Sequence, residues 1–303
     1  MITIIVVSVL RRFAVLAVAL TGSLVACGGD DGPSAGERPT VVVTTSILGA
    51  VVSEVVGDAA DVEVLMANGT DPHEWEASPK DIERLTEADF VVVNGLGLEG
   101  SLVEAVASVR ARGIPVFEAA RHVDVIAVEG AEEHPDGDPH FWTDGSAMAE
   151  VAMALGDALS DAGIGVGDRA SVVYEDLLTL DNDVRERAAT LDVNARKLVT
   201  GHESLAYFAR SYGFELVGAV VPGLSSEAEV SAGELSDLKR LIESEGVSVI
   251  FTEIGTPSQV VGAIADEVGA RVVEIDTHLL PAEGGYEAFL TGLVSAIVDA
   301  LAS

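Results

Sequence analysis

Residues 169–191 read RASVVYEDLLTLDNDVRERAATL, a stretch with no glycine or proline to interrupt a helix. Apolar side chains recur on one side of it, at Val172, Leu177, Leu180 and Val184, with the spacing of an amphipathic helix. Together with its flanks, the helix would have roughly 25 residues and, at about 1.5 Å per residue, a length of about 40 Å. The stretch therefore predicts a rigid helical connector inside the chain.

Strand and helix patterns alternate on both sides of this connector. Before it, the apolar run TVVVTT at 40–45 is followed by helical spacing at 47–56. After it, strand patterns again alternate with helical ones, from 198 to 301. This alternation predicts an α/β fold with mostly parallel sheets. We expect an N-terminal lobe, a linking helix and a C-terminal lobe, at 40–165, 166–195 and 196–303.

The first 26 residues have the pattern of an export signal. Arg11-Arg12 precedes an apolar stretch at 13–25 that is too short to span a bilayer. The stretch ends in Leu24-Val25-Ala26-Cys27, which resembles a bacterial lipobox and implies cleavage before Cys27 and a lipid on it. The alternative is a plain secretory signal with an incidental cysteine. We expect a lipidated tether at 27–39, and a protein anchored to the outer face of the cytoplasmic membrane or in the periplasm.

Charge and cysteine content narrow the possible partners and sites. The 303 residues carry 50 acids and 17 bases, a formal net charge of −33. So acidic a protein is repelled by nucleic acid, which we therefore exclude as a partner. Cys27 is the only cysteine, so an internal disulfide and a cysteine-based zinc site are excluded as well. Any metal site must use histidine, aspartate or glutamate.

A short pattern occurs twice before the connector. Asp71-Pro72-His73-Glu74-Trp75 recurs as Asp138-Pro139-His140-Phe141-Trp142. Proline fixes φ and biases the preceding aspartate toward an extended conformation, so each histidine is held in a stiff loop. The aspartate can accept a hydrogen bond from the loop or from an imidazole N–H, which orients a metal-bound histidine, and the tryptophan can shield a site from water. The repeat indicates that His73 and His140 bind a metal ion.

Further candidates lie after the connector, where strands end and loops begin. His202 stands in TGHES at a strand-to-helix turn, and Asp276 follows the strand pattern VVEI. Side chains from both halves could converge on a cleft between the lobes. Three histidines and a carboxylate form a four-coordinate set that Zn²⁺ accepts well. We predict the ligands to be His73, His140, His202 and Asp276. His278 is the rival for the fourth position.

Two other residues are candidates for supporting or weaker roles. Glu253, after the strand pattern VIFT, is either an acceptor behind a ligand or a structural carboxylate. His134 lies in the acidic loop at 127–137, where histidine and acids can collect zinc weakly, although a solvated loop is the simpler interpretation. For each ligand the alternative is a side chain that only packs in a loop or caps a helix.

Five segments, taken in this order, resemble the zinc/manganese solute-binding lipoproteins of ABC transporters, the ZnuA/TroA-like cluster A-I family. They are DPHEWEASPKD at 71–81, DPHFWTD at 138–144, GHESLAYFARSYGFE at 201–215, FTEIGTPS at 251–258 and EIDT at 274–277. The resemblance covers about residues 40–303. It implies two α/β lobes joined by a long rigid helix, with the metal between them. Matched motif by motif, the resemblance implies that the metal ligands are His73, His140, His202 and Asp276.

The resemblance also implies delivery of the metal to a membrane permease with a cytoplasmic ATPase. Zinc-type members have His at the third ligand position and manganese-type members usually have Glu, and this chain has His202 there. Imidazole suits Zn²⁺ and carboxylate-rich sites suit Mn²⁺. Two features depart from the family: the loop at 127–137 is acidic rather than His-rich, and Asp276-Thr277 replaces the frequent Asp-Pro. We expect a monomeric Zn²⁺-binding protein, with Mn²⁺ or Fe²⁺ as the alternative cargo.

A zinc metallohydrolase is the main alternative from another class. A catalytic zinc keeps an open position for water, with a general base beside it. The chain has no His-Glu-x-x-His pattern, and four ligands would close the coordination shell. Only Glu74 and Glu203 directly follow a candidate ligand histidine as possible bases. A cell-adhesion role is permitted by the lipid anchor, but no sequence feature requires it. We expect a binding protein rather than an enzyme.

Overall fold

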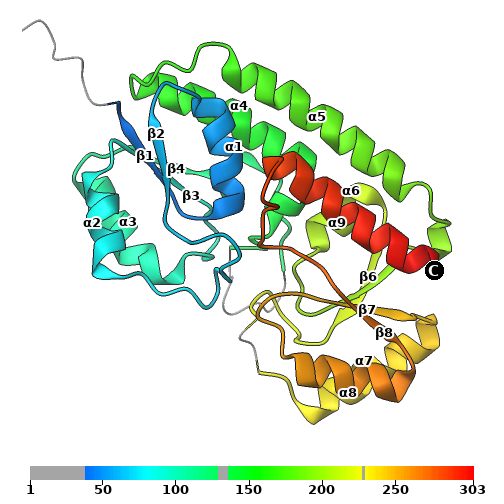
Figure 1. The fold of residues 1–303 in the computed structure, drawn as a ribbon. Coiled ribbons are helices and arrows are strands. Elements are labelled where there is room, and N and C mark those ends of the chain that lie inside the picture. Colours follow the sequence, from blue (N-terminus) through cyan, green and yellow to red (C-terminus); the bar gives the residue numbers. More distant parts are fainter. Residues whose placement is uncertain (1–37, 129–135, 227–228) are drawn as a thin grey trace, which may run out of the picture. The chain divides into compact units, whose positions relative to one another are not determined.

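The N-terminal half alternates strands and helices, as the sequence predicts (Figure 1). Its elements are β1 (Thr40–Val43), α1 (Ser46–Val56), β2 (Asp61–Val64), α2 (Pro79–Glu87), β3 (Phe90–Val93), α3 (Val103–Ala111), β4 (Val116–Glu118) and α4 (Gly145–Asp161). The strands form one sheet in the order β2-β1-β3-β4, and each neighbouring pair is parallel. The carboxyl ends of these strands therefore meet at one edge of the sheet.

The computed structural model describes residues 38–128, 136–226 and 229–303, and Arg38–Ser303 group into one compact unit. Several predictions made from sequence lie outside the described residues. They are the signal peptide at 1–26, the lipid on Cys27, most of the tether at 27–39, and His134 in its acidic loop.

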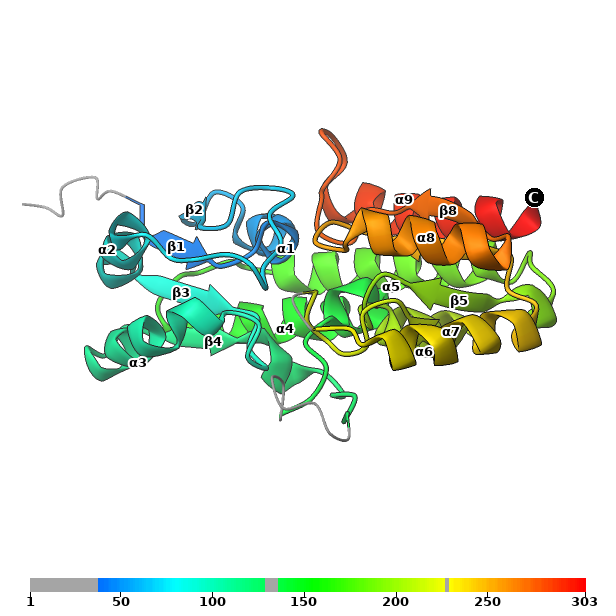
Figure 2. The ribbon, with the colours of Figure 1, turned by 90° about the horizontal axis from the view of Figure 1, so that it is seen from below.

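Both faces of the N-terminal sheet are buried, as is usual for parallel sheets. Val41 and Val43 of β1 face a core shared with α1 and α4, whereas Val42 faces a second core under α2 and α3. Figure 2 shows α1 and α4 on one side of the sheet and α2 and α3 on the other. The near-continuous valine runs of β1 and β3 follow from this burial.

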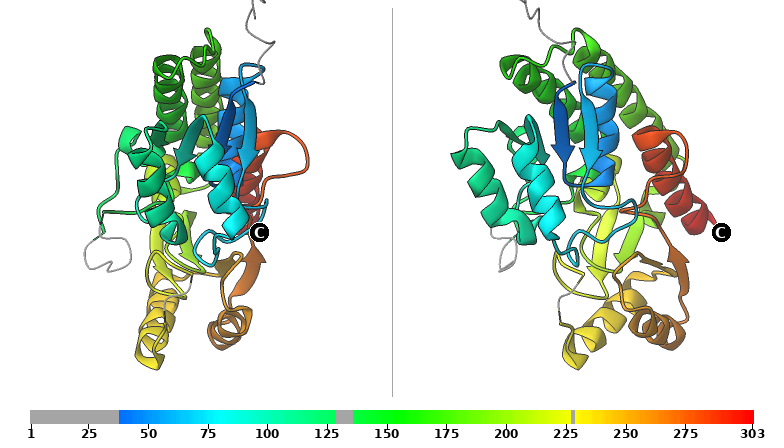
Figure 3. Two further views of the ribbon diagram at one scale, coloured as in Figure 1. Left: turned by 90° about the vertical axis from the view of Figure 1, so that its left-hand side faces the viewer. Right: turned by 60° about the vertical axis from the view of Figure 1, so that its left-hand side comes forward.

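The C-terminal half repeats the alternation after the connecting helix. Its elements are α5 (Arg169–Ala188), β5 (Lys197–Thr200), α6 (Ala206–Tyr212), β6 (Glu215–Ala219), α7 (Ala232–Glu245), β7 (Val249–Thr252), α8 (Ser258–Val268), β8 (Arg271–Glu274) and α9 (Gly285–Ala302). Strand β5 pairs with β6 and β7 with β8, both in parallel. Figures 1 and 3 show α7 and α8 beside each other, and they cover a core of their own that includes Val199 and Ile250.

The connecting helix α5 is shorter than predicted. It has 20 residues and ends at Ala188, after which the chain turns and the Arg196 guanidinium donates to the Leu191 carbonyl. Its buried side includes Val173 rather than the predicted Val172, whose side chain is exposed. One core runs from the N-terminal sheet through α4, α5 and α9 to β5 and β7. The lobe boundaries inferred from sequence therefore remain a prediction.

Helix α9 is, within the described ranges, the one helix long and apolar enough to cross a membrane. Its apolar residues, including Phe289, Leu290 and Ile297, are buried in the core shared by the two halves. This burial accounts for its composition.

Helix α6 begins at Ala206, so the residues that follow β5 lie in a turn before it. The Glu203 N–H donates to the Gly223 carbonyl at 2.9 Å, and the His202 carbonyl accepts from both the Ser204 N–H and the Thr200 hydroxyl. These bonds hold the residues after β5 in an irregular turn, which places His202 at the end of its strand.

Candidate metal centre

Three histidines from both halves of the chain converge. One ring nitrogen of each of His73, His140 and His202 lies within 4.8 Å of the other two. The Nε2 atom of His140 lies 3.2 Å from Nε2 of His73 and 3.4 Å from Nε2 of His202. Two nitrogen ligands of a tetrahedral zinc ion, each about 2.0–2.1 Å from it, lie about 3.3–3.4 Å apart. The three nitrogens are therefore spaced as ligands of one ion.

His140 is held by the aspartate of its own motif. Asp138 Oδ1 accepts the His140 main-chain N–H at 2.9 Å and the ring Nδ1–H at 2.7 Å, with both side chains fully buried. Because Nδ1 carries the hydrogen in this arrangement, Nε2 presents its lone pair to the centre. The Tyr207 hydroxyl donates to the Asp138 carbonyl and fixes the loop from behind.

The first motif forms the same turn. Asp71 Oδ1 accepts the His73 N–H at 2.9 Å, as Asp138 does for His140. The second oxygen of Asp71 accepts a hydrogen bond from Ser226, a residue of the C-terminal half, at 2.6 Å. His73 is half-buried, whereas the other two histidines are fully buried.

His202 is paired with the carboxylate of Glu253. Its Nδ1 lies 3.0 Å from Glu253 Oε1, and the Ser204 and Thr277 hydroxyls donate to the same carboxylate at 2.8 and 2.6 Å. Burial alone would raise the pKa of Glu253, but the neighbouring His202 and these hydrogen bonds hold it below its usual range. Glu253 thus lies on the Nδ1 side of the ring, and Nε2 faces the centre, 3.4 Å from Nε2 of His140.

Asp276 and His278 occupy different environments. Asp276 is exposed and His278 is buried, and both lie outside the group of three histidines whose ring nitrogens are within 4.8 Å of one another. The His278 ring lies 6.4 Å from that of His202 and 6.5 Å from that of His73, measured between centroids. The buried His278 ring thus lies beside two of the three histidines, whereas the Asp276 side chain is exposed.

The hydrogen bonds of Thr277 define which nitrogen of His278 is available. The Thr277 hydroxyl donates to Glu253, so its oxygen accepts from His278 Nδ1 at 3.0 Å. The opposite nitrogen, Nε2, is buried and has no hydrogen-bond partner within the described part of the chain. Burial lowers the pKa of His278 to about 4, which favours the neutral imidazole that a metal requires.

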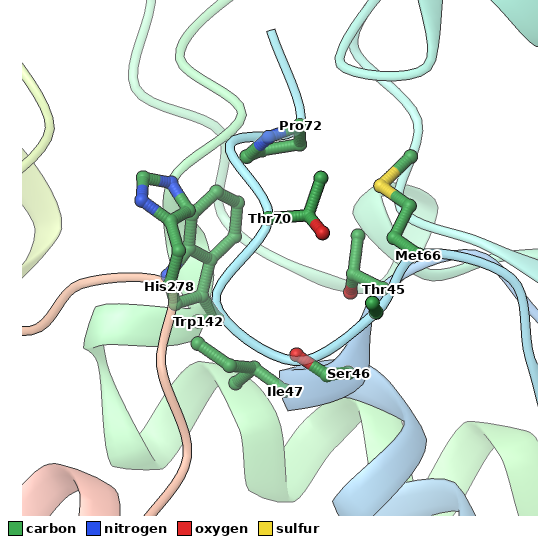
Figure 4. A pocket seen from close by; sticks show the side chains of 9 residues that line it. Thr45, Ser46, Ile47, Met66, Thr70, Pro72, Trp142 and His278 are labelled. Atoms are coloured by element: carbon green, nitrogen blue, oxygen red, sulfur yellow. The ribbon is translucent and has the colours of Figure 1, made fainter. Parts of the chain in front are cut away.

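A small cavity lies beside His278. Its volume is about 20 Å³, which is room for one water molecule. Figure 4 shows Thr45, Thr70, Pro72 and Trp142 around it together with His278. Polar hydroxyls therefore line a space next to the available imidazole.

The two tryptophans of the repeated motif have different roles. Trp142 is buried, packs against the rings of His140 and His278, and donates its Nε1–H to the Thr277 carbonyl at 2.9 Å. Trp75 instead packs against the core under α2 and α3. The expected shielding of the site thus applies to the second motif alone.

Sequence reasoning missed the hydroxyl groups that support the carboxylates. Ser204 and Thr277 lie within two residues of a candidate histidine, and this proximity in sequence could have indicated their role. Ser226 lies far from every candidate in sequence and carried no such signal.

The chain is similar to known zinc-binding and manganese-binding proteins. The model of the family described as ZnuA, zinc-uptake complex component A, periplasmic, matches residues 41–300. The zinc-binding protein TroA of Treponema pallidum is 32% identical over 297 residues, covering 93% of this chain and 95% of TroA. The manganese-binding lipoprotein MntA of Halalkalibacterium halodurans is 27% identical and covers 92% of each chain. The solved structure of Treponema pallidum TroA matches with a TM-score of 0.77 at 28% identity, over 87% of this chain and 99% of that one.

Proposed function

Because this chain belongs to the family of periplasmic zinc-uptake components, we propose that it captures Zn²⁺ outside the cytoplasm and delivers it to an ABC-type permease with a cytoplasmic ATPase. The convergence of the Nε2 atoms of His73, His140 and His202 carries this proposal. In this proposal the metal is the transported cargo. The protein binds and releases the ion and catalyses no reaction with it.

The fourth ligand in this proposal is His278. Its Nε2 is buried beside the three other imidazoles with no other partner among the described residues, whereas Asp276 is exposed. Asp276, the choice from sequence, becomes the alternative. Four imidazoles favour Zn²⁺ over Mn²⁺, because Mn²⁺ prefers oxygen ligands.

Mn²⁺ or Fe²⁺ is the second candidate cargo. One relative is named a zinc-binding protein and another a manganese-binding lipoprotein, and the two have similar sequence identity to this chain. We also propose that the chain is a monomer held at the membrane by a lipid on Cys27. The MntA relative is named a lipoprotein, which supports the anchor.

The cargo is tested with metal-stripped protein exposed to equal concentrations of Zn²⁺ and Mn²⁺, followed by elemental analysis of the desalted protein. We expect bound zinc in preference to manganese, and a shift toward manganese in the His202→Glu variant, which introduces an oxygen ligand. Preferential manganese binding by the unmodified protein would overturn the zinc assignment.

The fourth ligand is tested by two matched variants. His278→Ala should lower zinc affinity, whereas Asp276→Ala should leave it unchanged, because the Asp276 side chain is exposed. The reverse result would make Asp276 the ligand.

A further inference from the structure

The loop that carries His73 is attached to the C-terminal half at two points. At its start, the Asn68 side chain accepts from the Leu280 N–H at 2.8 Å and donates to the Leu280 carbonyl at 2.9 Å. The Gly69 N–H donates to the His278 carbonyl at 3.2 Å. The Asn68 bonds are exposed, so water competes with them and they contribute little.

The second attachment is buried and involves a charge. The Ser226 hydroxyl donates to Asp71 Oδ2 at 2.6 Å, and the exposed fractions of these residues are 5% and 4%. Asp71 Oδ1 meanwhile accepts the main-chain N–H of His73. One carboxylate therefore connects the backbone of a proposed ligand to the opposite half of the protein. Hydrogen bonds to a charged group are stronger than neutral ones, and more so away from water.

A third loop closes around this bond. Gly255, after β7, has φ +86°, and a Cβ atom added there would lie 2.0 Å from Asp71 Oδ2 and 2.9 Å from Ser226 Oγ. Any side chain at this position would push the aspartate away from the serine. The absence of a side chain at Gly255 allows the two loops of the C-terminal half to enclose the Asp71 carboxylate.

We propose that the Asp71–Ser226 hydrogen bond is a latch that retains the metal by holding the His73 loop against the C-terminal half. Ser226 is a positioning residue that acts through Asp71 without contacting the metal. Without this bond the His73 loop keeps only its exposed attachment to the C-terminal half, so the loop separates from that half more often and the ion escapes faster, while the coordination of the bound ion stays the same. The inference rests on the proposed function, since it assigns the control of metal release to a defined bond of that site.

The test is the dissociation rate of Zn²⁺ from the loaded full-length protein, followed with a chromogenic chelator in excess. Ser226→Ala should release zinc about tenfold faster or more, the effect of losing one hydrogen bond to a buried charge. The visible absorption spectrum of the Co²⁺-loaded variant should match that of the unmodified protein, because the ligand set is intact. Ser226→Thr, which keeps the hydroxyl, should restore slow release.

Two matched controls separate the latch from general damage. Asn68→Ala removes the exposed attachment of the same loop and should change the release rate much less than Ser226→Ala. Ser53→Ala removes a hydroxyl that donates to the Gly49 carbonyl within α1, and it should leave the rate of zinc release unchanged. Gly255→Ala, which displaces Asp71 without removing either partner, gives an independent break and should accelerate release.

Release from Ser226→Ala and Gly255→Ala at the rate of the unmodified protein would overturn the latch. An altered Co²⁺ spectrum in Ser226→Ala would also overturn it, because the serine would then act on the coordination itself. Failure of the unmodified protein to bind Zn²⁺ would instead refute the proposed function.

Discussion

The two Asp-Pro-His-x-Trp motifs form the same turn and then differ in what stands behind the histidine. In both, the aspartate accepts the main-chain N–H of the histidine at 2.9 Å. In the second motif the same oxygen also holds the imidazole of His140. In the first motif the carboxylate reaches Ser226 in the other half. Two motifs that match at four of five positions therefore give one histidine whose ring is held by its own motif and one whose loop is bonded to the C-terminal half.

This difference suggests that the histidines of one site contribute differently to binding the ion and to retaining it. His140 and His202 have their Nδ1 atoms paired with buried carboxylates, so their rings are oriented before the ion arrives. His73 lies on the loop that is attached across the two halves, and it is the least buried of the three. Capture and retention of the ion can then depend on different residues.

Replacing one histidine in each motif is the largest perturbation of this comparison. We expect both His140→Ala and His73→Ala to lower Zn²⁺ affinity by more than ~10–100-fold. That range is typical of losing a group that hydrogen-bonds to a ligand, and these variants remove the ligand itself. His140→Ala should also lower the free energy of unfolding of the metal-free protein by about 1–3 kcal/mol, because it removes a donor from buried Asp138. His73→Ala should cost less stability. Competition titration and chemical denaturation measure the two effects, and equal losses of stability would contradict the comparison.

Removing the charge behind His140 is a smaller change. Asp138→Asn keeps an oxygen acceptor for Nδ1–H but removes the negative charge that strengthens the ligand, so zinc affinity should fall about tenfold. Asp237→Asn, a change of an exposed aspartate on α7, is the matched control and should have no effect. Unchanged zinc affinity in Asp138→Asn would show that the carboxylate has only a structural role.

The tryptophans provide the mildest test. The chain has two, so single Trp→Phe variants report each motif separately by fluorescence. Zn²⁺ should change the emission of Trp142, which packs against His140 and His278, and this change should remain in Trp75→Phe. It should be lost in Trp142→Phe. A zinc-dependent signal that follows Trp75 would show that the first motif shields the site after all.

The fold and most of the site could be predicted because they follow from local patterns. Apolar runs separated by helical spacing define the parallel sheets, and histidines at the carboxyl ends of strands are brought to one edge. The sequence pattern extends α5 to Leu191, three residues past its end at Ala188. The turn that carries His202 could not be predicted, because it is held by a bond from the Glu203 N–H to the carbonyl of Gly223, which is distant in sequence. Such bonds leave no trace in a sequence window.

The choice between Asp276 and His278 shows the same limit. The two residues are separated only by Thr277, and either could supply a ligand. The Thr277 hydroxyl donates to Glu253, the residue after β7, and accepts from the ring of buried His278, whereas Asp276 is exposed. The residue types that could bind the metal were evident from the sequence. Which of the two side chains points inward depends on the bond between Thr277 and Glu253 in the folded chain.

X-ray absorption at the zinc edge of the loaded protein would identify the ligands of the bound ion. We expect about four nitrogen neighbours at about 2.0 Å with the outer-shell pattern of imidazole rings, and no sulfur. We also expect that His278→Ala loses one ring from this pattern and that Asp276→Ala loses none. A shell of three imidazoles and one carboxylate oxygen would contradict His278 as the fourth ligand, and a shell with fewer than three imidazoles would contradict the site as a whole.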